Sequence, residues 1–345
     1  MNALVRSLAA MSGLRDREAL DAALVRLVIS SGEGMVHSAC LIRVVGEGDD
    51  RRCLVLARVD AASAPLSRDL LWTDWTILPH VHDFPLRQQA VESGHAVHAA
   101  TSPRTTVVPL VTPQGIWGLL EIGTDQALSA QALELVDGIL LTYNNLRGLL
   151  DYGEKDALTE LLNRKSFDGA FFRATAEQHD DSLPEGGDRR HLHSEAGVWL
   201  AVLDIDHFKH VNDTFGHLIG DEVLLLLARL MRSCFRFHDQ LYRFGGEEFV
   251  VLMRCDSVDH AEAALERLRE RVQAYAFPQV GTITVSIGFS ILLPHDTPSD
   301  AFGRADKAVY HAKEHGRNQV CSYQALVASG DLKDQVAEGM DVDLF

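Results

Sequence analysis

The chain has few cysteines, and they are not arranged as a site. The five are odd in number and scattered, and none belongs to a CxxC pair: Cys40, Cys53, Cys234, Cys255 and Cys321. A disulfide framework would instead show an even set at close spacing. We therefore expect these cysteines to be small buried side chains in a reducing cytosol.

Long hydrophobic runs are also missing. The longest, Val223–Met231, is interrupted by Arg229, and a membrane-spanning helix needs about 20 apolar residues. Residues 1–15 contain no apolar stretch followed by a small-residue cleavage site, which is the mark of a secretory signal. We therefore expect a soluble, cytoplasmic protein without membrane insertion.

Positive charge is in deficit. The chain has 32 Lys and Arg against 49 Asp and Glu, which gives a net charge of −17. A surface that binds nucleic acid or anionic lipid without sequence preference needs the opposite sign. We expect no nucleic-acid partner, and any phosphate ligand must be held by local cations or by metal.

The 345 residues are 46% hydrophobic and 23% charged, which predicts a globular protein of two domains. In the first half, 4–30 has helical spacing, and 39–45 and 53–59 are expected strands. A hairpin is predicted from 107–111 and 116–123 around Thr112-Pro113-Gln114-Gly115. The order of these elements, with Pro109-Leu110-Val111, Gly115 and Trp117-Gly118-Leu119-Leu120-Glu121, resembles a GAF-type sensory domain over residues 1–127.

That resemblance implies a small-molecule ligand or signal, which the sequence does not identify. Five histidines lie in this half: His37, His80, His82, His95 and His98. Ligation of a metal or haem by some of them is one interpretation. The other is surface or hydrogen-bonded histidines, which we favour because no pair has a recognised ligand spacing.

A helix is expected over 128–157, between the two domains. Five residues follow 4-3-4-3 steps typical of a coiled-coil seam: Leu135, Ile139, Thr142, Leu146 and Leu149. An overlapping stripe consists of Leu133, Val136, Leu140, Tyr143 and Leu150. The helix either packs along the first domain or dimerises as a signalling helix. We favour the dimer, because no Pro or Gly linker separates the helix from the next domain.

The second half predicts an α+β domain. Apolar residues 198–203 form a buried strand that ends in Asp204-Ile205-Asp206, and a helix is expected over 212–234. Two apolar runs around Gly245-Gly246 predict a hairpin with a type I′ turn, whose second strand opens with Glu247 and Glu248. We also expect helices at 258–275 and 299–315, the latter with Ser299 as N-cap, and strands at 282–292 and 319–323. Together these elements follow a ferredoxin-like, palm-type order.

This order places the strand of Asp204 and the Gly-Gly hairpin in one sheet. Carboxylates from adjacent strands can then converge on a divalent cation. Ligands that are oxygen only select Mg²⁺ or Mn²⁺, and such a metal can activate a hydroxyl and neutralise a pyrophosphate leaving group. We therefore expect Mg²⁺, or Mn²⁺, as the cofactor.

Four blocks in order carry a second resemblance. They are Asp156-x-Leu158-Thr159-x-Leu161-x-Asn163-Arg164, then Leu203-Asp204-Ile205-Asp206-His207-Phe208-Lys209-x-x-Asn212-Asp213-x-x-Gly216-His217-x-x-Gly220-Asp221, then Arg243-Phe244-Gly245-Gly246-Glu247-Glu248-Phe249, and Ala305-Asp306-Lys307-Ala308-x-Tyr310-x-Ala312-Lys313-x-x-Gly316-Arg317-Asn318. They resemble the GGDEF family of diguanylate cyclases in its GGEEF form, with a nucleotide-cyclase palm sheet. The domain is expected over 158–330, followed by an acidic tail over 331–345.

The resemblance implies condensation of two GTP into cyclic di-GMP and two pyrophosphates across a homodimer. It implies catalytic roles for Glu247 and Lys313. It implies metal binding by Asp204, Ile205 through its carbonyl, Glu247 and Glu248. It implies substrate binding by Phe208, Lys209, Asn212, His217, Asp221, Lys313 and Arg317. Asn212 and Asp221 would contact guanine, which offers a carboxylate two donors where adenine offers no matching pair, so GTP is favoured over ATP.

Some of these residues also have simpler interpretations. Asp206 would be a solvated strand end and His217 a helix-surface residue. Lys313 and Arg317 would be surface charges that compensate a helix dipole. Because the motifs occur together and in order, we favour the functional interpretation.

A further pattern is Arg236-Phe237-His238-Asp239, at the spacing of the family's RxxD inhibitory site. Arg can bind guanine O6 and N7 in a fork, and Asp can accept from its Watson–Crick edge. Arg267 is a second cationic candidate, and an ordinary surface ion pair is the alternative. We predict product feedback inhibition. The competing functions are a non-catalytic cyclic di-GMP receptor and a scaffold that acts through the coiled coil.

Overall fold

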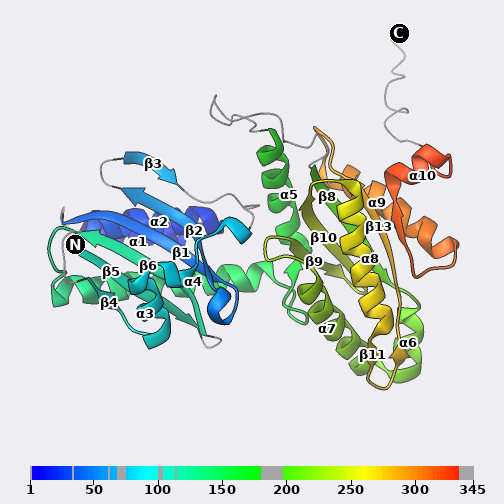
Figure 1. Ribbon diagram of the computed structural model, residues 1–345, viewed down its shortest axis with the longest axis horizontal. Coiled ribbons are helices and arrows are strands. Elements are labelled where there is room, and N and C mark those ends of the chain that lie inside the picture. Colours follow the sequence, from blue (N-terminus) through cyan, green and yellow to red (C-terminus); the bar gives the residue numbers. More distant parts are fainter. Residues whose placement is uncertain are drawn as a thin grey trace, which may run out of the picture. The chain divides into compact units, whose positions relative to one another are not determined.

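The computed structural model describes residues 2–32, 35–60, 63–67, 75–99, 104–112, 115–179 and 197–333. The chain divides into two compact units, Met1–Gly153 and Glu154–Phe345 (Figure 1). Two predicted segments lie mostly outside the described residues: the centre of the 112–115 turn and the acidic tail from 331.

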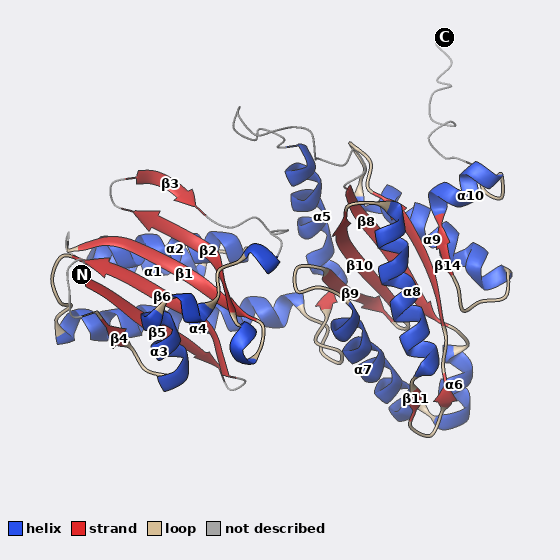
Figure 2. Ribbon diagram, viewed as in Figure 1, coloured by secondary structure: helices blue, strands red, loops and turns tan. Residues whose placement is uncertain are grey.

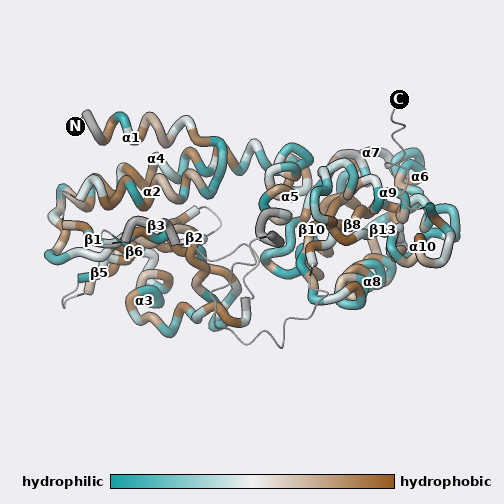
Figure 3. Tube along the Cα trace, turned by 90° about the horizontal axis from the view of Figure 1, so that it is seen from above, coloured by the Kyte–Doolittle hydropathy of each residue, from teal (hydrophilic) through white to brown (hydrophobic). Residues whose placement is uncertain are grey.

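The first unit is a six-stranded sheet of antiparallel pairs, in the order β3-β2-β1-β6-β5-β4. Figure 3 shows α1, α2 and α4 on one side of this sheet and α3 on the other. The elements are α1 (Asn2–Ser12), α2 (Arg17–Ser31), β1 (Val36–Val45), η1 (Gly48–Asp50), β2 (Arg52–Asp60), β3 (Ser63–Ser67), η2 (Trp75–Ile77), η3 (Val81–Asp83), α3 (Pro85–Ser93), β4 (Val97–His98), β5 (Arg104–Thr112), β6 (Gly115–Thr124) and α4 (Ala130–Glu154).

Both faces of this sheet are buried. Along β1, Ala39 and Leu41 pack with the helices of one face, and Cys40 and Ile42 pack into a second cluster with α3. This alternation is the period of two of a strand, here apolar on both sides. All five cysteines of the chain are free. Four are buried, as the sequence predicts, whereas Cys255 is only partly buried. Assignment of this unit to the GAF type stays a prediction.

The histidines of this unit make ordinary contacts. His80 and His82 stack with ring centroids 4.6 Å apart, and His98 Nδ1 lies 3.0 Å from Thr106 Oγ1. Within the described residues of the chain, no three His, Cys, Asp or Glu side chains form a group that could hold a metal ion.

The linking helix α4 uses its first half to complete the first unit. Val136, Ile139, Leu140 and Tyr143 are buried in its core, whereas Leu149 is 69% exposed. The buried residues come mainly from the stripe that overlaps the predicted seam. Of the predicted seam, Ile139 is buried and Leu135 and Leu146 pack against the same core, so Leu149 is its one exposed residue. Dimerisation stays a prediction.

The second unit is a mixed α/β fold around a second six-stranded sheet (Figure 2), in the order β14-β13-β8-β10-β9-β7. Its elements are β7 (Leu162–Asn163), α5 (Arg164–His179), β8 (Gly197–Ile205), α6 (Phe208–Phe215), α7 (His217–Cys234), β9 (Gln240–Gly245), β10 (Glu248–Cys255), α8 (Val258–Ala274), β11 (Ala276–Phe277), β12 (Gly281–Thr282), β13 (Val285–Ile291), α9 (Pro298–Glu314), β14 (Val320–Ser322) and α10 (Tyr323–Ser329).

Strand β8 is central and buried along its whole length, with antiparallel partners β10 and β13. One face of the sheet packs against α7 and α8 in a large apolar cluster. On the other face α9 approaches β13 so closely that a Cβ on Gly288 would lie 2.2 Å from Ala305 O. The sheet is therefore fixed from both sides, and the end of β8 has a defined position.

Two predicted helix starts are wrong. The helix expected over 212–234 is two helices, because Gly216 at φ 84° and ψ 159° interrupts it between α6 and α7. Helix α9 is capped by Thr297 rather than Ser299. Pro298 occupies the first turn, and Thr297 and Asp300 exchange the hydrogen bonds of a capping box, which was not predicted from the sequence.

No helix among the described residues is long and apolar enough to cross a membrane.

Candidate active site

The end of β8 and the Gly-Gly hairpin meet in register. Glu248, the first residue of β10, pairs directly with Asp204 on β8. Directly paired residues of antiparallel strands point to the same face of the sheet. The two carboxylates therefore lie side by side at one end of the sheet, where Asp204 is 9% exposed and Glu248 is exposed.

The hairpin turn differs from the prediction. Strand β9 continues to Gly245, which pairs with Glu248, so the turn residues are Gly246 and Glu247. Positive φ occurs at Gly245 (147°) and Gly246 (52°) but not at Glu247, and a type I′ turn needs it at both central residues. The predicted type I′ turn at Gly245-Gly246 is therefore wrong. Glu247 sits at the tip of the hairpin, and only Glu248 opens the strand.

A lysine forms an ion pair with Asp204. Lys313, in the last turn of α9, places Nζ 2.9 Å from Asp204 Oδ2. Burial raises the pKa of Asp204 above its ordinary value, and the bond to Lys313 opposes that rise. The pKa of Glu247 is also raised, mainly by burial and secondly by repulsion from the charge of Asp204. The three groups therefore share one electrostatic environment.

The donor chemistry suits a hard cation. Asp204, Glu247 and Glu248 offer carboxylate oxygens, and Ile205 ends β8 with its backbone carbonyl. Oxygen donors are those that Mg²⁺ and Mn²⁺ prefer. Among the described residues, however, no three His, Cys, Asp or Glu side chains lie close enough together to coordinate a metal ion. The Lys313 ammonium beside Asp204 supplies the positive charge instead.

The α6–α7 corner carries the predicted base-contacting residues. Asn212 packs against Gly220 so closely that a Cβ there would lie 2.0 Å from Asn212 Oδ1. His217 and Asp221 lie exposed in the first turns of α7. Gly220 therefore lets the two helices close, which brings Asn212 next to the turn that carries Asp221.

The predicted phosphate-contacting residues come from two helix ends. Phe208 and Lys209 form the first turn of α6, where backbone N–H groups lack helical partners and suit an anion. Arg317 follows the end of α9 and is exposed, with φ 63°. Asp206 is not a solvated strand end, because it is buried and accepts three hydrogen bonds.

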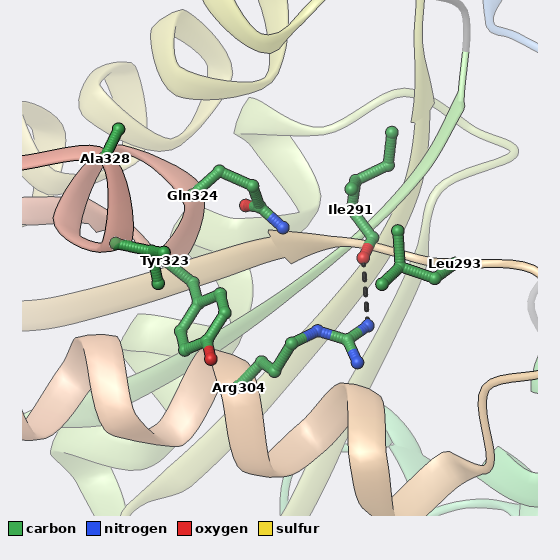
Figure 4. Close-up of a pocket in the computed structure, with 7 residues that line it drawn as sticks. Ile291, Leu293, Arg304, Tyr323, Gln324 and Ala328 are labelled. Atoms are coloured by element: carbon green, nitrogen blue, oxygen red, sulfur yellow. Dashed lines mark hydrogen bonds between the residues drawn. The ribbon is translucent and has the colours of Figure 1, made fainter. Parts of the chain in front are cut away.

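A pocket of about 290 Å³ lies at the other end of β13 (Figure 4). Ile291 pairs with Trp199, whereas Ser286 pairs with Asp204, so the pocket is distant from the carboxylates along the sheet. Its charged residue, Arg304, donates to Ile291 O at 3.2 Å and forms an ion pair with Asp296. That cation is already neutralised, so this pocket is a poor phosphate site. It is lined by Ile291, Leu293, Arg304, Tyr323, Gln324, Val327 and Ala328.

Comparison with known families decides the identity of the second unit. Residues 154–319 match the family described as "Diguanylate cyclase, GGDEF domain". The second unit contains a GGDEF domain.

Curated relatives share this GGDEF domain. The chain is 41% identical over 168 residues to diguanylate cyclase DgcP of Pseudomonas aeruginosa, covering 48% of this chain and 23% of that protein. It is 39% identical over 165 residues to diguanylate cyclase DgcM of Escherichia coli K12, covering 48% of this chain and 37% of that protein. The chain thus spans well under half the length of these relatives.

A solved structure is similar to part of this chain. The coiled coil and GGDEF domain of DgcB from Caulobacter crescentus, in complex with c-di-GMP, is 30% identical. The match has a TM-score of 0.47 and covers 57% of this chain and 100% of that one.

The RxxD residues of this GGDEF domain lie close together. Asp239 Oδ2 accepts a hydrogen bond from the Arg236 backbone N–H at 2.7 Å, and Arg267 Nη2 donates to Cys234 O at 2.7 Å. Burial raises the pKa of Asp239 to about 6, although the charges of Arg236 and Arg267 oppose the rise. The Asp239 side chain is 6% exposed. It is thus held by backbone, and it is not the exposed ion pair that was the alternative.

Two residues of the GGDEF motifs make a contact that was not predicted from the sequence. Asp156 and Arg243 form an ion pair at 3.0 Å. Arg243 also donates from Nη2 to Gly246 O at 2.9 Å. The sequence shows both motif positions, but the two residues lie 87 positions apart, so their contact could be identified only from the fold.

Proposed function

We propose that the chain is a diguanylate cyclase, which condenses two GTP into cyclic di-GMP. In each half-reaction a ribose 3′-hydroxyl attacks the α-phosphorus of the other GTP. A new P–O bond forms, the bond to pyrophosphate breaks, and the hydroxyl proton passes to a base. The observation that carries the proposal is the register pairing of Glu248 with Asp204 at the Gly-Gly turn, with Lys313 at 2.9 Å from Asp204.

Asp204, Glu247, Glu248 and the carbonyl of Ile205 would hold Mg²⁺ or Mn²⁺. Such an ion lowers the pKa of the attacking hydroxyl and neutralises the leaving pyrophosphate. Their oxygen donors and their place at one end of the sheet support this assignment.

Glu247 would also receive the proton of the 3′-hydroxyl. Burial raises its pKa, and a base whose pKa lies nearer the working pH is the better general base. Its position in the turn rather than in the strand leaves the carboxylate at the hairpin tip, where a nucleotide can reach it.

Different residues would bind the phosphates and the guanine base of GTP. Lys313 and Arg317 would contact the β- and γ-phosphates, and Phe208 and Lys209 would offer backbone N–H groups. Asn212 and Asp221 would bind the guanine edge, with His217 nearby. Lys313, which pairs with Asp204 in the structure, would then contact a phosphate of the bound GTP.

Each domain holds one GTP in this proposal, so two chains must pair to bring two nucleotides together. The exposed end of α4, with Leu149 69% exposed, supports a homodimer contact. The first unit would control this pairing through an unidentified ligand or signal. Product bound at Arg236, Asp239 and Arg267 would inhibit the enzyme.

The test is incubation of the full chain with Mg²⁺ and either GTP or ATP, with separation of the products by chromatography. We expect cyclic di-GMP from GTP and no cyclic dinucleotide from ATP. Binding of added cyclic di-GMP without any product from GTP would indicate the receptor function instead. Neither binding nor turnover would contradict both.

A further inference from the structure

Asp206 has a different environment from Asp204, two residues earlier. It follows β8 directly and is 6% exposed. Its Oδ2 accepts from Thr284 Oγ1 at 2.6 Å and from Asn318 N at 3.0 Å, and its Oδ1 accepts from Ser286 Oγ at 2.7 Å. Both carboxylate oxygens are thus engaged inside the protein, so Asp206 is not arranged as a ligand of a bound ion.

One of these partners belongs to an unusual turn. Gly316, Arg317 and Asn318 follow one another with φ 110°, 63° and 46°. The left-handed region costs free energy for residues with a Cβ, and it persists only where the surroundings hold it. Arg317 and Asn318 therefore need external support for their backbone.

Three hydrogen bonds from backbone N–H groups supply that support, and Asn318 Oδ1 also accepts from Arg269 Nη1 at 3.1 Å. Arg317 N donates to Ala312 O at 2.9 Å, which ties the turn to α9. Ile287 N donates to Gln319 O at 3.0 Å, which ties it to β13. The bond from Asn318 N to Asp206 is the one that ties it to the end of β8.

We infer that Asp206 is a positioning residue for GTP binding, which acts through the 316–318 turn on Arg317. The two carboxylates at the end of β8 then have different roles: Asp204 would bind the cation, and Asp206 fixes the backbone of the phosphate-binding Arg317. This inference rests on the proposed function, because it takes Arg317 as a contact to the GTP phosphates.

The chemistry predicts a graded response at this position. Asp206→Ala removes the acceptor and leaves the half-buried Asn318 N–H without its partner, which is the costly case. Asp206→Asn keeps one carbonyl oxygen that can accept from Asn318, and its amide can donate to a hydroxyl of Ser286. Ser286→Ala is the matched control, because it deletes the Oδ1 contact and leaves the bond to Asn318 in place.

The experiment measures KM for GTP and kcat for cyclic di-GMP formation in these variants, with thermal unfolding as a check of the fold. We expect Asp206→Ala to raise KM about tenfold and to change kcat by less than about threefold. Asp206→Asn and Ser286→Ala should each stay within about threefold of the wild-type KM. Should Asp206→Ala unfold, Asp206→Val takes its place, because it fills the space and accepts no hydrogen bond.

A double-mutant cycle separates positioning from a general structural role. If Asp206 acts through Arg317, then Asp206→Ala raises KM by less than about twofold in an Arg317→Ala background. Equal effects in both backgrounds, or a loss of kcat alone, would overturn the inference. A wild-type chain that neither binds GTP nor forms product would instead contradict the proposed function, so the two failures are distinguishable.

Discussion

Arg243 joins Asp156 to the carbonyl of Gly246. Its Nη1 donates to Asp156 Oδ1 at 3.0 Å, and its Nη2 donates to Gly246 O at 2.9 Å. Gly246 precedes Glu247 in the hairpin turn, and Asp156 lies two residues after the end of α4. One guanidinium therefore connects the entry of the GGDEF domain to the turn that carries the proposed base.

Arg243→Ala should lower cyclic di-GMP formation about tenfold to a hundredfold with a smaller effect on stability, because a slightly misplaced turn moves Glu247 away from the hydroxyl. Steady-state rates at saturating GTP provide the measurement. Arg254→Ala is the control, since Arg254 is exposed on the adjacent strand β10. Equal rates for wild type and Arg243→Ala would remove this role of the contact.

Lys313→Met should lower kcat/KM for GTP by about 10²–10³, since it removes a preorganised positive charge from the proposed phosphate site. The matched control is Lys307→Met on the same helix α9. If Lys313 served only to neutralise Asp204, the loss would be compensated by raising the Mg²⁺ concentration. Such full recovery at high Mg²⁺ would argue against a contact to phosphate.

Product inhibition should depend on pH through Asp239. Its pKa of about 6 lies above the ordinary value of 3.8, so the carboxylate that accepts from guanine is lost as pH falls through 6. The cyclic di-GMP concentration for half inhibition should therefore rise as the pH is lowered from about 7 to about 5. Asp239→Asn should remove both the inhibition and its pH dependence. An unchanged half-inhibition concentration across this range in wild type would contradict the assignment.

The same shift has an opposite consequence for stability. A carboxyl whose folded-state pKa is raised binds its proton more tightly in the folded than in the unfolded state. Its contribution to the free energy of unfolding therefore falls as pH rises from 3.8 to about 6, by linkage. Chemical unfolding of Asp239→Asn at pH 7 should show a protein at least as stable as wild type, and a clearly less stable variant would contradict the raised pKa.

The order of the motifs was sufficient to predict that the strand of Asp204 and the hairpin are neighbours. The apolar runs predict strands β8 and β10, and the Gly-Gly pair predicts the turn before β10. In the structure these two strands are antiparallel, and Glu248 pairs with Asp204. The turn type was wrong because β9 extends through Gly245 and its register shifts after Glu248. That shift depends on the pairing of two strands and not on either sequence alone.

Other features could not be predicted because they depend on packing at long range. The two overlapping stripes of α4 look alike in sequence, and the core of the first unit decides that Val136, Leu140 and Tyr143 are buried. Asp206 resembles any acidic residue after a strand until Ser286 and Asn318 are placed beside it.

The most direct test of the proposed active site compares wild type and Glu247→Gln for cyclic di-GMP formation at saturating GTP and Mg²⁺. GTP binding is measured in parallel by equilibrium titration. We expect product from wild type, and from Glu247→Gln a rate lower by at least about 10³-fold with GTP still bound, because the variant loses a metal oxygen and the base. A Glu247→Gln rate within about tenfold of wild type would contradict the site, and no product from wild type would contradict the activity itself.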